Sequence, residues 1–335
     1  MAMDKSAADA FVYAKASGML ARSFVGERAQ TLFSVRTLQE LWSLLFAKEV
    51  PVVPETMLAK ALEQEAQNHF IAEYKKLVQN YARPEPLLIS LLTFFDYDNL
   101  KELGAALCMH ESAMPVVQDI SPYNLIDYGK WPDIAAMTAK GPLAWYDTVP
   151  ALSEQQQNDY RLDCQYIAEV WANAKAVDAS CRNAVLGLLG EKFRMENVLW
   201  ALRLRVYYGM GRKDVLEHLA YASGERHLHD TLVKDAVATL DWELDTYERW
   251  RSWKYHALLN PSEEGVPWMI DPRWISNSFK RLYVQKAYRL FHQFPFTACP
   301  LVCWFIVKRD ELDNIRTASE MLRLHVQHTE EVFNG

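Results

Sequence analysis

Residues that interrupt helices are scarce in this sequence. Its 335 residues include only 12 glycines and 14 prolines. Glycine and proline mark most loops and turns, whereas the abundant alanine, leucine, glutamate, lysine and arginine favour helices. The scarcity argues against a protein built from many short strands and predicts an all-α fold with long helices. Half of the residues are hydrophobic, which is enough for more than one packed core.

A basic surface and a long apolar run are both missing. The net charge is −7, whereas a protein that binds nucleic acid usually has a basic surface. The longest apolar run, "ACPLVCWFIV" at 298–307, is well short of the ~20 residues that span a bilayer. The opening stretch "MAMDKSAADAFVYAKASG" mixes charges and lacks the apolar region of a signal peptide. We expect no nucleic-acid partner, and a soluble, cytoplasmic protein that meets a membrane only as part of a complex.

Paired cysteines are missing as well. The five cysteines are scattered and form no CxxC motif, which is typical of free thiols in a reducing compartment. Cys299 and Cys303 lie four apart in an apolar stretch. Because no further ligand motif surrounds them, we interpret them as two core residues on one helical face rather than as a metal pair.

Motifs of catalytic, nucleotide and metal sites are also absent. No glutamate precedes any of the nine histidines by three positions, so the Glu-x-x-His motif of di-iron carboxylate bundles does not occur. There is no GxxxxGK[ST], no GxGxxG and no GxSxG. We therefore expect no catalytic residue, no cofactor and no metal ligand. One alternative rests on Asp96 and Asp98, which could bind Mg²⁺ in an all-helical prenyl-transfer enzyme, although such a site needs several converging carboxylates.

The sequence does contain one short motif, the repeated phrase, that occurs three times. It occurs as "YDNLKE" at 97–102, "MENVLW" at 195–200 and "LDNIRT" at 312–317. Each copy reads apolar, acidic, asparagine, aliphatic, and each follows a long helical stretch, a break and a compact apolar stretch. The acidic residues and asparagines are Asp98, Asn99, Glu196, Asn197, Asp313 and Asn314. This recurrence predicts a threefold internal duplication, in which each helical unit buries its apolar face on its neighbours.

The duplication predicts three similar helical domains, at 1–112, 113–215 and 216–335. Hydrophobic periodicity predicts the individual helices. The predicted helices cover 5–22, 38–49, 54–82, 87–95, 99–110, 152–177, 181–193, 196–208, 227–259, 272–294, 301–309 and the stretch after Asn314. The segment 111–150 contains five prolines and is predicted to form short helices and loops.

Two features leave alternatives open. The repeated asparagine either caps a new helix by accepting its unpaired amides or, if the helix runs through, reaches a partner across the bundle. The tryptophan-rich segment 242–274 contributes either core side chains, the default, or interface anchors. Its tryptophans are Trp242, Trp250, Trp253, Trp268 and Trp274.

The C-terminal copy carries the most specific pattern. Within "FIVKRDELDNIRTASEML" (305–322), apolar residues are followed by a lysine, a glutamate, an asparagine, an aliphatic residue and an arginine. These positions are Lys308, Glu311, Asn314, Ile315 and Arg316. Together with "FRMENVLWALRLR" (193–205), "DPRWISNSFKRL" (271–282) and "FVYAKASGMLARSFV" (11–25), the pattern resembles the C/d subunit family of rotary V-type (V/A-type) ATPases. The resemblance covers most of the chain and is loosest across 110–150.

The resemblance implies a fold of three similar helical domains around a pseudo-threefold axis, shaped like a funnel. It implies a central-stalk subunit without catalytic residues or cofactor, placed between the membrane proteolipid ring and the central shaft subunits and carrying torque between them. The repeat-signature residues are then structural: Asp98, Asn99, Glu196, Asn197, Lys308, Glu311, Asp313, Asn314 and Arg316. The alternative from another class is a soluble α-helical-repeat scaffold that binds other protein partners.

Overall fold

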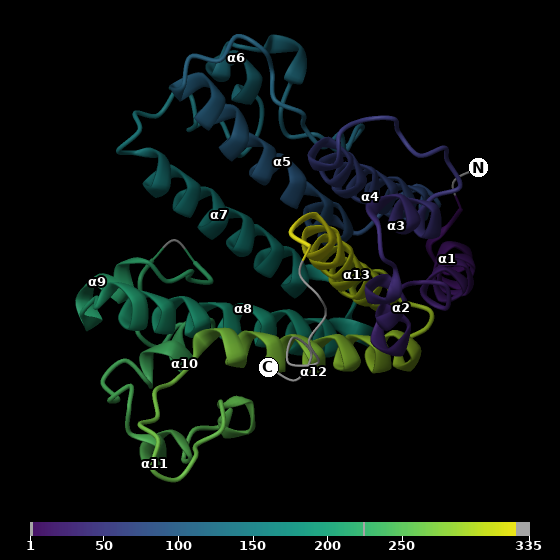
Figure 1. Ribbon diagram of the computed structural model, residues 1–335. Coiled ribbons are helices and arrows are strands. Elements are labelled where there is room, and N and C mark those ends of the chain that lie inside the picture. The colour runs from purple at the N-terminus through teal and green to yellow at the C-terminus, as the bar shows by residue number, and fades with distance from the viewer. Residues whose placement is uncertain (1–2, 224, 326–335) are drawn as a thin grey trace. The chain divides into compact units, whose positions relative to one another are not determined.

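The computed structural model describes residues 3–223 and 225–325 (Figure 1). Within these ranges the chain is 63% helical and contains no strand of a sheet. The all-α prediction is therefore confirmed. The ends of the first and third predicted domains, residues 1–2 and 326–335, lie outside the described residues, as does Gly224.

The chain divides into two compact units. Of the described residues, one unit contains those up to Leu162 and those from Leu290 to His325, and the other contains those of Asp163–Arg289. The boundaries fall inside two helices, α7 (Gln155–Ala176) and α12 (Pro272–Gln293). Compactness does not report internal duplication, so the three similar domains at 1–112, 113–215 and 216–335 stay a prediction.

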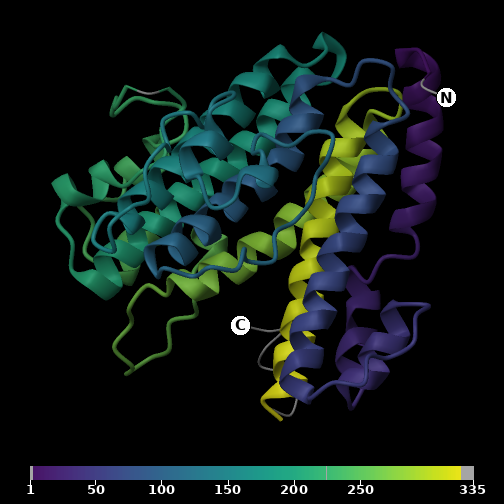
Figure 2. The ribbon, with the colours of Figure 1, turned by 90° about the horizontal axis from the view of Figure 1, so that it is seen from above.

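Among its described residues, the first unit is built on four long helices. Figure 2 shows α4 and α13 side by side, with α1 next to them. The long helices are α1 (Lys5–Leu20), α4 (Glu55–Val78), α5 (Pro86–Cys108) and α13 (Cys299–Arg323). The shorter ones are η1 (Gly26–Ala29), α2 (Gln30–Ser34), α3 (Leu38–Leu45), η2 (Tyr128–Lys130) and α6 (Ile134–Thr138). The two short helices in the proline-rich segment confirm the prediction made for 111–150.

Aromatic rings join α4 to α13 at the centre of this unit. The indole of Trp304 stacks on Phe70 and Tyr74, with ring centroids 5.6 and 5.7 Å apart. Phe305 meets the same two rings edge-on, at 5.2 and 5.1 Å. All four side chains are buried. Such pairs add about 0.5–1.5 kcal/mol each to the gain from burial, so this cluster fixes the two helices against each other.

The amphipathic pattern of α4 agrees with the sequence. The apolar residues that recur every four positions along this helix are buried, namely Leu58, Leu62, Ala66, Phe70 and Tyr74. The N-terminal residues of this set, Leu58, Leu62 and Ala66, pack into a second hydrophobic cluster with Leu41 of α3 and Ile315 of α13. Because residues four apart lie on one face of a helix, the same face of α4 contributes to both the aromatic cluster around Trp304 and this second cluster.

The break predicted before each compact apolar stretch is present, but the two helices predicted on either side of each repeated phrase are joined into one. The stretches 87–95 and 99–110 form the single helix α5, and 181–193 and 196–208 form the single helix α8 (Ala179–Tyr208). The stretch 301–309 and the stretch after Asn314 likewise form the single helix α13. Neither glycine nor proline lies at the junctions 96–98, 194–195 and 310–314, and aspartate or asparagine in a helix interior costs only about 0.7 kcal/mol relative to alanine. Burial of the flanking apolar residues outweighs that cost, so the asparagines are not helix caps.

The prediction of a helix over 227–259 is also wrong. This part of the second unit contains only α10 (Lys234–Val237), α11 (Tyr247–Trp250) and η3 (His256–Leu258), after α9 (Arg212–Glu217). The indole of Trp250 donates to the backbone oxygen of Glu243 at 2.7 Å and is fully buried. Trp253 is buried against it and Trp268 is buried against Tyr247, whereas Trp242 and Trp274 are half-buried. Turns packed around tryptophans therefore take the place of the predicted long helix. Trp250, Trp253 and Trp268 are core side chains, as the default interpretation predicted.

Candidate functional site

The asparagine of the first copy holds a distant backbone segment onto α5. The Oδ1 atom of Asn99 accepts a hydrogen bond from the backbone N–H of Gln118, and its Nδ2 donates to the carbonyl of the same residue, both at 2.9 Å. The side chain thus binds both polar groups of one residue, 19 positions away. Its Nδ2 also donates to the hydroxyl of Tyr128 at 2.6 Å. The asparagine is an amide clamp for the proline-rich segment.

The asparagine of the second copy makes the same kind of clamp. The Oδ1 atom of Asn197 accepts from the backbone N–H of Ala220 at 2.8 Å, and Nδ2 donates to the carbonyls of Ala220 and Leu232 at 2.8 and 2.9 Å. Ala220 follows Asn197 by 23 positions. The side chain is buried, with 3% of the residue exposed. Two copies of the repeated phrase therefore hold the segment that follows their helix by the same bidentate contact, the second of the two roles left open above.

The third asparagine makes a different contact. The Nδ2 atom of Asn314 donates to Oδ2 of Asp310, one turn earlier on α13, at 3.3 Å. The residues that follow α13 beyond His325 lie outside the described part of the chain. Among the described residues, Asn314 therefore shares the position inside a continuous helix with the other two asparagines but not their contact.

A buried carboxylate lies one helical turn before the first clamp. Asp96 is fully buried, and its Oδ1 accepts from the hydroxyl of Tyr128 at 2.6 Å while its Oδ2 accepts from the backbone N–H of Leu125. Burial raises the pKa of Asp96 to about 6, although both hydrogen bonds act in the opposite direction. Burial and the neighbouring carboxylate also raise the pKa of Tyr128. Asp96 therefore extends the Asn99 clamp to a second point on the same segment.

Asp98 points to another side of α5. Its side chain is 57% exposed, and Lys101 Nζ lies 3.9 Å away. Asp96 and Asp98 therefore do not converge, which removes the geometric basis of the prenyl-transfer alternative. Among residues 3–223 and 225–325, no group of three or more His, Cys, Asp and Glu side chains is arranged to hold a metal ion.

The C-terminal signature contributes a buried ion cluster. Lys308 Nζ contacts the carboxylate of Glu311 and lies 3.3 Å from Oε2 of Glu73 on α4, as an ion pair without hydrogen-bond geometry. Oε1 of Glu311 accepts from the backbone N–H of Phe24, after α1, at 2.6 Å. Lys308 and Glu311 are 8% and 6% exposed. The cluster joins α13, α4 and the end of α1, and loss of one partner of such a buried pair costs about 3–5 kcal/mol.

The remaining signature residues are more exposed. Arg316 Nε lies 3.1 Å from Oε2 of Glu63 on α4, but the arginine side chain is 67% exposed, so the pair contributes less than about 1 kcal/mol. Glu196 pairs with Lys192 on the outside of α8. The nine predicted residues are thus distributed over two clamps, one buried ion cluster and the helix surfaces, rather than over one site.

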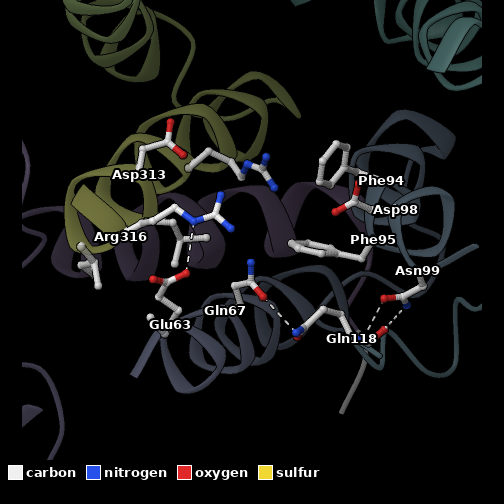
Figure 3. A pocket seen from close by; sticks show the side chains of 13 residues that line it. Glu63, Gln67, Phe94, Phe95, Asp98, Asn99, Gln118, Asp313 and Arg316 are labelled. Carbon is white, nitrogen blue, oxygen red and sulfur yellow. Dashed lines mark hydrogen bonds and ion pairs between the residues drawn. The ribbon is translucent and has the colours of Figure 1, made fainter. Parts of the chain in front are cut away.

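Signature residues of the first and third copies meet in one pocket between α4, α5 and α13. Its volume is about 210 Å³ (Figure 3). Figure 3 shows Arg316 turned toward Glu63 and the amides of Gln67 and Gln118 turned toward each other, the latter pair 2.9 Å apart. The lining residues are Glu63, Ala66, Gln67, Phe94, Phe95, Asp98, Asn99, Gln118, Arg309, Leu312, Asp313, Ile315 and Arg316.

Sequence reasoning missed Arg309 as a pocket residue. Its guanidinium carbon lies 4.2 Å from the ring centroid of Phe94 and 5.8 Å from that of Phe95. The signal available was its position, next to Lys308 and one turn before Asp313. Because Lys308 faces the interior of the unit, its neighbour on the helix had to face another side.

Nearly all of these contacts hold elements of an all-α chain together. The family model described as ATP synthase (C/AC39) subunit matches residues 12–330. The match covers nearly the whole chain, and the chain therefore belongs to this family of V/A-type ATP synthase subunits. The resemblance seen in the sequence is confirmed. In the described part of the chain, no helix has both the length and the apolar character needed to cross a bilayer.

A relative of similar length is found in Treponema pallidum. The chain is 31% identical over 322 residues to an uncharacterized protein of Treponema pallidum (strain Nichols). The alignment covers 96% of this chain and 94% of that protein. The similarity therefore extends over both units, the proline-rich segment included.

Proposed function

We propose that this chain is a non-catalytic central-stalk subunit of a V/A-type rotary ATPase. In this role it links the membrane proteolipid ring to the central shaft and transmits torque between ion transport and ATP hydrolysis or synthesis. Membership of the C/AC39 family across residues 12–330 is the observation that carries the proposal. The subunit has no catalytic residue of its own, needs no cofactor, and lies on the cytoplasmic side of the membrane through its complex.

The mechanical demand on such a subunit is stiffness. A linker that deforms would dissipate the work of each rotary step as strain. Buried polar contacts resist deformation because each displaced donor or acceptor loses its partner in a medium of low dielectric constant. The Asn99 and Asn197 clamps and the Lys308–Glu311–Glu73 cluster are contacts of this type, and they tie segments distant in the sequence to long helices.

The internal duplication is part of the proposal. Each of three similar helical domains would present its long helix and its clamped segment around a pseudo-threefold axis. The matching amide clamps of Asn99 and Asn197 support an origin from one building block. The signature residues are proposed to act in this architecture and not in chemistry.

Co-purification of the native complex tests the proposal. An affinity-tagged copy of this chain, expressed at its native level, is isolated in mild detergent and the bound proteins are identified by mass spectrometry. We expect proteolipid ring and central shaft subunits in the eluate, and no nucleic acid. Recovery of soluble partners alone would contradict the proposal and favour the helical-repeat scaffold.

A further inference from the structure

We propose that residues 118–128, here called the strap, open from and close onto α5 in response to pH, and that the proton on Asp96 controls this motion. The strap follows α5 in the chain and is held to it by the Asn99 clamp and by Asp96. All of these residues belong to the first unit. The inference does not rest on the proposed function, since it concerns the response of one unit of the chain to pH.

The polar contacts between the strap and α5 converge on two side chains. Asn99 binds the backbone of Gln118, while Asp96 accepts from the backbone N–H of Leu125 and from the hydroxyl of Tyr128. The hydroxyl oxygen of Tyr128 lies 2.6 Å from Oδ1 of Asp96 and 2.6 Å from Nδ2 of Asn99, so it connects the two side chains. A change at Asp96 therefore affects the contacts at both ends of the strap.

The strap can open without the helices. It consists of turns and bends and contains no helix before η2 begins at Tyr128. Its apolar anchors are Ile120 and Ile126, both buried. A segment with few buried apolar contacts and no helical hydrogen bonds opens at a lower free energy than the core of the protein. Opening of the strap exposes Asp96 to water while α4, α5 and α13 stay packed.

Closure of the strap places Asp96 in surroundings that suit the neutral acid. The carboxyl group is fully buried, and among the residues that the structure describes no cation lies within ion-pair distance of it. The charged group of the strap that acts on it is Asp119, which has the same sign. A buried charge without a counter-ion is costly. The neutral acid avoids that cost and still offers acceptor oxygens to Leu125 and Tyr128.

The helices around Asp96 bring no compensating charge to it. On α5 itself, the carboxylate of Asp98 is 57% exposed and points to another side of the helix. On α13, the guanidinium of Arg309 lies over the ring of Phe94. On α4, the side chain that is hydrogen-bonded to the strap is Gln67, which is uncharged. The titration of Asp96 is therefore governed by its burial and by the strap.

The sign of the pH dependence follows from the two states of the strap. In the closed state burial raises the pKa of Asp96 from 3.8 to about 6, although the hydrogen bonds from Tyr128 and the backbone lower it. In the open state the hydrated carboxyl group titrates near its ordinary value. Closure is therefore most favourable below pH 3.8 and weakens as the pH rises to about 6. The opening equilibrium constant should rise about 10-fold from pH 5 to pH 7 and change little above pH 7.

Amide hydrogen exchange of the purified full-length chain tests the proposal. Exchange rates of the Gln118 and Leu125 amides, divided by the intrinsic rate at each pH, give the opening equilibrium constant. We expect the corrected rates of both amides to rise about 10-fold from pH 5 to pH 7 and then to level off. Amides in the middle of α4 report unfolding of the whole unit, and they should be better protected than the strap amides at every pH.

Three variants assign the effect to Asp96. Asp96→Asn removes the titrating group, so the corrected exchange of Leu125 should no longer depend on pH, whatever its level. Asp98→Asn is the matched control, because it removes one negative charge from the exposed side of the same helix, and it should keep the wild-type pH dependence. Tyr128→Phe removes a hydrogen bond that favours the ionised form, so the rise should extend to higher pH. Circular dichroism of each variant confirms that the helices are intact.

Four results would overturn the proposal. These are corrected exchange that is independent of pH in the wild-type chain, exchange that slows as the pH rises, a pH dependence that persists in Asp96→Asn, and equal protection of the strap and α4 amides. The last result would mean that the strap opens only when the whole unit unfolds. In the proposed rotor subunit, acidification would tighten this contact. That consequence rests on the proposed function, whereas the exchange experiment uses the isolated chain, so either can fail without the other.

Discussion

Replacement of Lys308 by methionine is the most informative perturbation of the fold. Methionine keeps most of the volume of the lysine stem and removes the charge, so the carboxylates of Glu311 and Glu73 lose their shared cation. Breaking a buried pair in this way costs about 3–5 kcal/mol. Glu311 keeps its hydrogen bond from the backbone of Phe24, and Glu73, with 20% of its side chain exposed, can turn to solvent. We therefore expect a loss near the lower limit, about 3 kcal/mol.

Urea unfolding followed by circular dichroism measures this loss. The matched control is Arg316→Met on the same helix, which removes a largely exposed pair with Glu63 and should cost less than about 1 kcal/mol. In the double variant Lys308→Met, Glu311→Gln the unpaired buried charge is gone, and we expect a coupling energy of about 1–3 kcal/mol between the two positions. A Lys308→Met protein as stable as Arg316→Met would refute the reasoning that the buried cluster locks α13 onto α4.

Three other substitutions test the clamps and the packing. Asn197→Leu leaves the N–H of Ala220 and two carbonyls without partners, so we expect a loss of about 3 kcal/mol and faster hydrogen exchange at that amide; unchanged exchange would contradict the clamp. The pKa of Asp96 is raised from 3.8 to about 6, so its contribution to stability is complete below pH 3.8 and lost as the pH rises through about 6. At 1.36 kcal/mol per pH unit this is about 3 kcal/mol, and Asp96→Asn should flatten that part of the stability–pH curve. At Gly104 an added Cβ would lie 2.1 Å from the hydroxyl of Tyr146, so Gly104→Ala should lower the free energy of unfolding by about 1–3 kcal/mol, and a neutral effect would show that the ring moves freely.

The sequence was most informative where local pattern and packing coincide. The apolar stripe of α4 and the start of α12 at Pro272 follow from periodicity and from proline chemistry. The repeated asparagine was also visible, because an amide that recurs among apolar residues needs a partner wherever it is buried. That partner could not be read, since Gln118 and Ala220 lie 19 and 23 residues downstream, in segments without periodicity.

Other features depend on tertiary contacts that leave no local trace. The segment 227–259 has the composition of an amphipathic helix, yet its tryptophans are buried by turns, with Trp250 bound to the backbone of Glu243. The continuity of α5 through Asp96 and Asn99 depends on the neighbours that bind these side chains. The pocket around Arg309 requires three helices from distant parts of the chain, and no spacing in one of them could indicate it.

Reconstitution of ion transport tests the central claim most directly. Rotary ATPase prepared without this chain is placed in vesicles, and ATP hydrolysis and ion transport are measured before and after the purified chain is added. A torque-carrying link predicts hydrolysis without transport in its absence, and recovery of transport when it is added. Transport at the full rate without the chain would contradict the claim that it couples the shaft to the ring.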